Sequence, residues 1–147
     1  MALDTTRWED LLYRFEAISV RWYTTVVAEV VGTDAFDAWF LGLDASDTDA
    51  VKVAVDLLEA RGLALGFPWS NALRGTRYAL RELRVQARGK AIRIAYAFDP
   101  ERRAVVLLGA HKSGSERRFY RRFVGEAESR WVQYLATRDD KDGVRGR

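Results

Sequence analysis

The spacing of three short apolar segments in the second half of the chain most constrains its fold. We expect strands over residues 78–86, 91–98 and 104–110. Turn residues separate them at Arg88-Gly89 and at Asp99-Pro100. Connections this short join antiparallel neighbours, because a parallel crossover needs a dozen or more residues. The sequence therefore predicts an antiparallel meander.

The middle segment alternates cleanly between two faces. One face carries only large apolar side chains, which are Ile92, Ile94, Tyr96 and Phe98. On the opposite face Arg93 lies among small neighbours, Ala95 and Ala97. Because side chains alternate along a strand, the first face is predicted to be core. The second face is either a solvated surface or a cleft in which Arg93 meets a ligand.

Helical spacing of apolar side chains is found before and after the meander. Thr6 and Glu9 form a possible capping box for a first helix. A strand over residues 22–31 is expected to end at Gly32, after which Thr33 or Asp34 caps a short helix. Further along the chain we expect a helix over 47–61 stopped by Gly62, an irregular connector over 62–75 and a last helix from Ser115.

These elements predict an α+β fold with one main domain. Residues 22–137 form that domain, residues 1–21 a helical extension and residues 138–147 a flexible tail. The last helix carries a stripe of apolar side chains at helical spacing, namely Phe119, Phe123, Ala127, Trp131 and Leu135.

Positive charge is concentrated in the segment that contains the meander. Residues 74–122 carry fourteen Lys and Arg against four Asp and Glu, whereas residues 1–73 carry five against twelve. A surface built from the middle segment would attract a polyanion such as a phosphate backbone.

Composition excludes several kinds of chemistry. The chain has no cysteine and one histidine, which excludes disulfides, thiolate nucleophiles and metal sites with several histidines. No apolar run approaches the roughly 20 residues of a membrane-spanning helix, and the first residues do not resemble a signal peptide. We therefore expect a cytoplasmic protein without a membrane partner.

Four ordered motifs resemble those of the HigB-like branch of the RelE/ParE toxin superfamily. In chain order they are LALGFP (63–68), LRELR (80–84), RIAYAFDP (93–100) and LLGAHK (107–112). The resemblance covers residues 26–136. It implies a small twisted, largely antiparallel sheet with helices packed on one side and a concave basic surface on the other. It also implies a type II toxin restrained by a cognate antitoxin that carries a helix-turn-helix.

The activity implied by this resemblance is ribosome-dependent cleavage of mRNA, which inhibits translation. Because the reaction uses the substrate's own 2′-hydroxyl, the endoribonuclease would need no metal and no other cofactor. It would need an acceptor for the 2′-proton, cations beside the phosphate and a donor for the 5′-oxygen. An alternative also fits the basic segment, a non-catalytic module that binds nucleic acid or acts on gyrase.

Four residues form the expected catalytic constellation: Arg84, Arg93, Lys112 and Tyr120. Arg84 matches the family's strand arginine and would bind a phosphate, or it would pair with Glu82 on the same strand face. Lys112 matches the family's lysine after the last strand. Surrounding arginines would favour the neutral amine that a general base needs, whereas a turn lysine would remain solvated. Tyr120 would stack on a base or pack on the sheet.

A wider set is expected to contact RNA, and it comprises Arg77, Arg81, His111, Arg117, Arg118 and Arg121. Arg81 shares its strand face with Leu83 and Val85, so we expect it near an edge of the sheet. His111 would shuttle protons near neutral pH or remain an exposed histidine. The arginines of the last helix would contact ribosomal RNA or form a solvated helix face.

Overall fold

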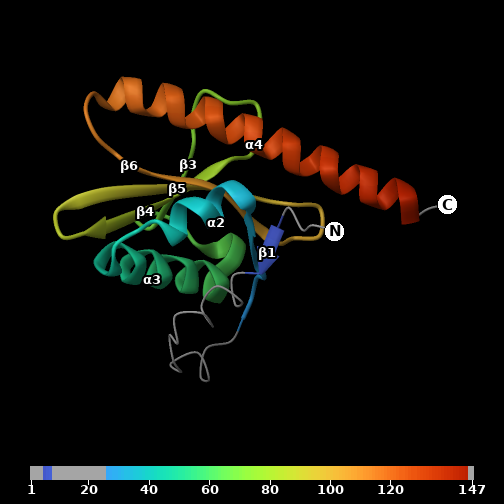
Figure 1. Cartoon of the computed structure of the whole chain (residues 1–147), viewed down its shortest axis with the longest axis horizontal. Helices are drawn as coiled ribbons and strands as arrows, with labels where there is room; N and C mark the ends of the chain where they lie inside the picture. The colour runs from blue at the N-terminus through green and yellow to red at the C-terminus, as the bar shows by residue number, and fades with distance from the viewer. Residues whose placement is uncertain (1–4, 8–25, 146–147) are drawn as a thin grey trace.

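A single six-stranded sheet organises the part of the chain that the structure describes. This computed structural model describes residues 5–7 and 26–145, with the backbone alone at 5–7 and 140–145. The strands lie in the order β1-β2-β6-β5-β4-β3 (Figure 1). The elements in chain order are β1 (Thr5–Arg7), β2 (Val30–Thr33), α2 (Asp34–Leu41), α3 (Ala45–Arg61), the 3-10 helix η2 (Gly62–Ala64), β3 (Ser70–Ala72), β4 (Arg81–Ala87), β5 (Lys90–Phe98), β6 (Ala104–His111) and α4 (Glu116–Arg145).

The predicted meander is confirmed, since β5 pairs antiparallel with both β4 and β6. The turn between β4 and β5 places Arg88 and Gly89 at φ values of 49° and 76°. Two consecutive positive φ values are typical of the tight hairpin turn that matches strand twist. The sheet is largely antiparallel, as expected, and β2 pairs parallel with β6.

A bulge in β6 decides which way the end of that strand faces. Ala95 pairs with Leu108 and Tyr96 pairs with Val106, so Leu107 is an extra residue. The Thr33 hydroxyl lies 3.1 Å from the carbonyl oxygens of both Val106 and Leu107. One inserted residue reverses the alternation of everything after it. The residues of β6 after Leu107 therefore point to the opposite face of the sheet from the one they would have in an unbulged strand.

Helices cover both faces of the sheet, with α2 and α3 on one and α4 on the other (Figure 1). The expectation that the helices pack on one side is therefore wrong. The central strands are apolar on both faces, and each face must be covered. One core holds Phe36, Phe40, Val51, Val55, Leu58, Ile92, Ile94 and Tyr96. The other core holds Ala95, Ala97, Val105, Leu107, Phe123, Ala127 and Trp131.

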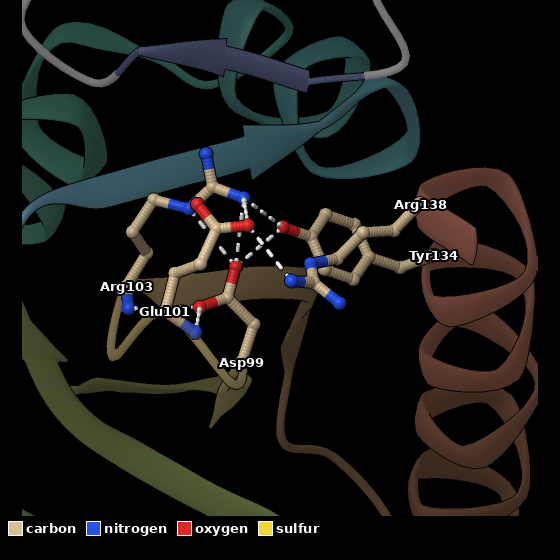
Figure 2. A network of polar contacts seen from close by, with 5 residues as sticks. All are labelled: Asp99, Glu101, Arg103, Tyr134 and Arg138. Carbon is tan, nitrogen blue, oxygen red and sulfur yellow. Dashed lines mark hydrogen bonds and ion pairs between the residues drawn. The ribbon is translucent and has the colours of Figure 1, made fainter. Parts of the chain in front are cut away.

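A buried polar network fastens α4 to the turn between β5 and β6 (Figure 2). Asp99 Oδ2 accepts hydrogen bonds from the Tyr134 hydroxyl at 2.7 Å and from Arg103 Nε at 2.9 Å. Burial alone raises the pKa of Asp99, but the hydrogen bonds from Tyr134 and Arg103 outweigh it and lower the pKa. Arg138 of α4 adds a bond to Glu101 Oε1 at 2.8 Å. The second half of α4 is thus anchored by charge as well as by packing.

The helix boundaries agree with the capping signals. Thr33 caps α2, as predicted, by accepting a hydrogen bond from the Phe36 amide. Asp44 caps α3 in the same way through the Asp47 amide, and the helix begins at Ala45, two residues before the expected start. The chain leaves α3 at Gly62, as predicted, with a φ of 54° that favours glycine.

Other boundaries differ from the sequence prediction. Residues 22–25 of the strand expected over 22–31 lie outside the described residues, and the strand that the structure shows, β2, begins at Val30 and continues through Gly32. The connector contains η2 and β3. Thr6 lies in β1 and pairs with Gly32 of β2. No helix begins at Thr6, because this segment adds a strand to the outer edge of β2. The rest of the predicted first helix, residues 8–21, lies outside the described residues. The backbone of α4 continues to Arg145, since extending an existing helix is far easier than nucleating one.

Candidate functional site

The structure brings the four expected catalytic residues together where α4 crosses the end of the sheet. Arg84 in β4 lies directly opposite Arg93 in β5. Arg93 Nε lies 3.2 Å from the Tyr120 hydroxyl in α4. Lys112, the first residue after β6, places its Nζ 5.6 Å from the centre of the Tyr120 ring. Four segments of the chain therefore contribute to one cluster.

The inner half of the cluster is a triad made of the buried Glu82 and Arg93 and the half-buried Tyr120. The Tyr120 hydroxyl donates to Glu82 Oε1 at 2.8 Å and accepts from Arg93 Nε. Arg93 also donates to the Ile92 carbonyl at 3.1 Å and lies 3.6 Å from Glu82 Oε1. The side chains of Arg93 and Glu82 are only 7% and 5% exposed. Arg93 is thus engaged inside the protein, so it is neither the cleft-lining cation nor the solvated strand residue that were the two expected alternatives.

The triad also determines the protonation of Tyr120. Burial raises the pKa of the Tyr120 hydroxyl, the bond to Glu82 raises it further, and the bond from Arg93 partly offsets both. The hydroxyl therefore stays protonated near neutral pH. With both partners inside the protein, Tyr120 presents its ring to the outer half of the cluster, where Lys112 lies over it.

The outer half of the cluster pairs Lys112 with a carboxylate that the sequence reasoning missed. Lys112 Nζ lies 2.6 Å from Glu116 Oε1 in the first turn of α4. The hydrogen bond from Lys112 lowers the pKa of Glu116, and the charges of Lys112, Arg84 and Arg93 lower it further. The nearest charge to Lys112 is therefore a carboxylate, whereas an arginine cluster had been expected.

Arg84 provides the available cation of the cluster. Its guanidinium Cζ lies 6.0 Å from the centre of the Phe67 ring. Among residues 26–139 no side chain accepts a hydrogen bond from this guanidinium, and Glu82, its expected alternative partner, pairs with Arg93. A half-buried, planar guanidinium with unused donors can bind two oxygens of a phosphate at once.

Two residues of the wider RNA-binding set lie on the far face of the sheet. Arg81 Nε donates to Ser70 Oγ at 3.0 Å, beside the buried Tyr96 hydroxyl. His111 Nε2 lies 2.8 Å from Asp47 Oδ2 in α3, because the bulge turns His111 to the face that α3 covers. Side chains alternate along β4 and β6, which places Arg81 and His111 on this far face, so neither residue joins the cluster.

The remaining members of this set are exposed. Arg117, Arg118 and Arg121 lie on α4 next to the cluster, and none forms an ion pair with another described residue. Arg77 lies before β4, with its guanidinium 5.1 Å from the centre of the Tyr78 ring and 2.9 Å from that hydroxyl. The helix arginines therefore extend the positive surface of the cluster, whereas Arg77 has a local partner.

Two acidic residues complete the site, and sequence signals for both were present. Glu82 shares a strand face with Arg84, and Glu116 stands four residues after Lys112. The cluster therefore combines cations, a protonated tyrosine and two carboxylate acceptors, which can bind an anionic group and exchange protons with it.

Within residues 26–139 no group of acidic, histidine or cysteine side chains could hold a metal ion. No helix in the described part of the chain is long and apolar enough to cross a membrane.

The chain is similar to known proteins over the region that contains this cluster. Residues 38–132 match the family described as phage-derived protein Gp49-like. Two relatives from Mycobacterium tuberculosis (strain ATCC 25618 / H37Rv) are named as candidate toxins, HigB2 and HigB3. HigB2 is 34% identical over 109 residues, which are 73% of this chain and 54% of HigB2. HigB3 is 37% identical over 102 residues, which are 69% of this chain and 88% of HigB3.

The chain thus spans about half the length of HigB2 and most of HigB3. No solved structure matches it significantly. The resemblance to HigB-like toxins is confirmed by these relatives, and all four cluster residues lie within the matched range.

Proposed function

This chain belongs to the phage-derived Gp49-like family, and from that membership and its polar cluster we propose that it is the toxin of a type II toxin–antitoxin pair. Its activity is cleavage of mRNA on the ribosome, which inhibits translation in the cytoplasm. The grouping of Arg84, Lys112, Glu116 and Tyr120 at one end of the sheet carries the proposal. The names of the two relatives support the toxin role.

In the proposed reaction the 2′-oxygen of one nucleotide attacks the adjacent phosphorus, and the bond from phosphorus to the 5′-oxygen breaks. The products are a 2′,3′-cyclic phosphate and a 5′-hydroxyl. Arg84 binds the phosphate oxygens and stabilises their developing charge. Glu116 accepts the 2′-proton and Lys112 donates a proton to the departing 5′-oxygen.

Glu116 therefore takes the general-base role that the sequence pattern assigned to Lys112. This assignment follows from the contact between the two side chains, which places a carboxylate acceptor beside an ammonium donor. Tyr120 holds Lys112 over its ring, and the buried partners Glu82 and Arg93 fix the orientation of Tyr120. Arg93 is thus a positioning residue in this proposal.

The proposal is tested by inducing the protein briefly in a host that lacks the antitoxin and mapping new RNA 5′ ends. We expect discrete ends in frame with translated codons. Arg84→Ala and Lys112→Ala should abolish them and relieve growth inhibition. Arg122→Ala is the matched control, because Arg122 is a highly exposed arginine that pairs with Glu126 on α4. Growth arrest with intact mRNA would refute the nuclease and favour action on gyrase or passive nucleic-acid binding.

The proposed partner is an antitoxin with a helix-turn-helix that covers the positive surface of α4. Arg117, Arg118 and Arg121 are exposed there next to the cluster, and they attract an acidic partner. Charge reversal at Arg117 and Arg118 should weaken co-purification of the antitoxin encoded beside the toxin gene. Unchanged binding by this variant would place the antitoxin on another surface.

A further inference from the structure

Two aromatic side chains are exposed in the turn that leads into β3, at the border of the polar cluster. Phe67 is 74% exposed and Trp69 is 47% exposed. Aromatic rings bury large apolar areas in most folds, so neighbouring exposed rings favour a binding surface. Phe67 belongs to the LALGFP motif, to which the roles assigned above give no function.

The backbone holds these rings in place. The amides of Trp69 and Ser70 both donate to the Gly66 carbonyl, at 3.1 and 3.0 Å. The Arg84 amide donates to the Trp69 carbonyl at 2.9 Å, which joins the turn to β4. Because these hydrogen bonds already order the turn, a ligand that binds the rings loses little affinity to the conformational entropy of the loop.

Each ring has a guanidinium beside it. Arg61 Cζ lies 5.3 Å from the centre of the Trp69 ring, and Arg84 Cζ lies 6.0 Å from the centre of the Phe67 ring. Arg84 is the same cation that the proposed reaction uses to bind a phosphate. An exposed ring next to a phosphate-binding cation matches the two parts of a nucleotide, a flat base and an anionic linkage.

We propose that Phe67 is a base-stacking subsite for single-stranded RNA, next to the phosphate bound by Arg84. This inference rests on the proposed function and adds to it the contact that holds a base. Removal of one aromatic ring that stacks on a base weakens binding about 5- to 150-fold. Stacking tolerates any base, so the subsite contributes affinity and orientation without selecting a sequence.

The test uses the full-length protein and two fluorescein-labelled probes, a mixed-sequence single-stranded RNA and an abasic ribose-phosphate chain of the same length. Dissociation constants are measured by fluorescence anisotropy. Phe67→Ala should weaken RNA binding at least about 5-fold and leave abasic binding unchanged. Phe67→Trp should retain RNA binding. Leu63→Ala is the matched control, because Leu63 is 71% exposed in the same motif but carries no ring.

Four outcomes would overturn the inference. If Phe67→Ala weakens both probes equally, Phe67 acts by orienting Arg84 and does not stack on a base. If Arg84→Ala weakens RNA binding and Phe67→Ala does not, the subsite is wrong while the proposed function stands. If Phe67→Ala retains RNA binding but loses the antitoxin, the turn is a protein-docking surface. If the wild-type protein does not bind free RNA at all, the subsite for single-stranded RNA is wrong, whereas the proposed function is refuted only by intact mRNA after induction.

Discussion

Replacing Glu82 with glutamine tests whether charge stabilises the triad of Glu82, Arg93 and Tyr120. The substitution keeps the shape of the side chain and an acceptor for the Tyr120 hydroxyl, but it leaves the Arg93 guanidinium without a counter-charge. Both side chains are less than 10% exposed, and their nearest charged atoms lie 3.6 Å apart. Water therefore cannot replace the lost partner.

The expected cost follows from this geometry. Two unit charges 3.6 Å apart attract by about 5 kcal/mol at an effective dielectric constant of about 20. Substitutions that remove one partner of a buried ion pair cost about 3 to 5 kcal/mol. Because glutamine keeps the hydrogen bond to Tyr120, we expect a loss of about 3 kcal/mol, a large part of the roughly 5 to 15 kcal/mol that stabilises a domain.

The assay is urea unfolding followed by tryptophan fluorescence and by far-ultraviolet circular dichroism. A double-mutant cycle adds Arg93→Met and the double variant. The double variant has no buried charge left in the triad, so it should be more stable than Glu82→Gln alone, with a coupling energy of at least about 2 kcal/mol. A loss below about 1 kcal/mol in Glu82→Gln, or additive effects in the double variant, would refute the role of charge in the triad.

Three further predictions concern the framework around the cluster. Gly109→Ala places a Cβ against the Trp39 ring, and the overpacking should cost about 1 to 3 kcal/mol in urea unfolding, whereas the exposed Gly125→Ala should not. Thr33→Val removes the cap of α2 and the hydroxyl at the β6 bulge, so it should cost about 1 to 2 kcal/mol, which Thr33→Ser should largely restore. Asp99 has a lowered pKa in the folded protein, so its stabilising effect is present above the ordinary value of 3.8 and is lost as pH falls further. Unfolding free energies measured from pH 7 to pH 3 should therefore fall more steeply below pH 3.8 in the wild-type protein than in Asp99→Asn, and parallel curves would contradict this role of the network in Figure 2.

Local signals were sufficient wherever neighbouring residues decide the structure. The turn at Arg88-Gly89 and the alternation around Arg93 predicted the hairpin and its two faces, because both depend on side-chain and backbone sterics within a few residues. Thr33 and Gly62 predicted helix ends for the same reason. The gathering of Arg84, Arg93, Lys112 and Tyr120 came from the resemblance, whose motifs preserve long-range contacts that periodicity does not encode.

What the sequence by itself determined is the main helices from Asp34 onward, the meander and the positive charge of its central segment. Only the tertiary structure decided that α4 covers the second face, that the bulge at Leu107 turns His111 to the face covered by α3, and that Arg93 is buried against Glu82. These features depend on partners far along the chain, such as Glu82 and Tyr120, which are 38 positions apart. A pairing of this kind has no local pattern, because its free energy exists only once the helix has packed on the sheet and excluded water.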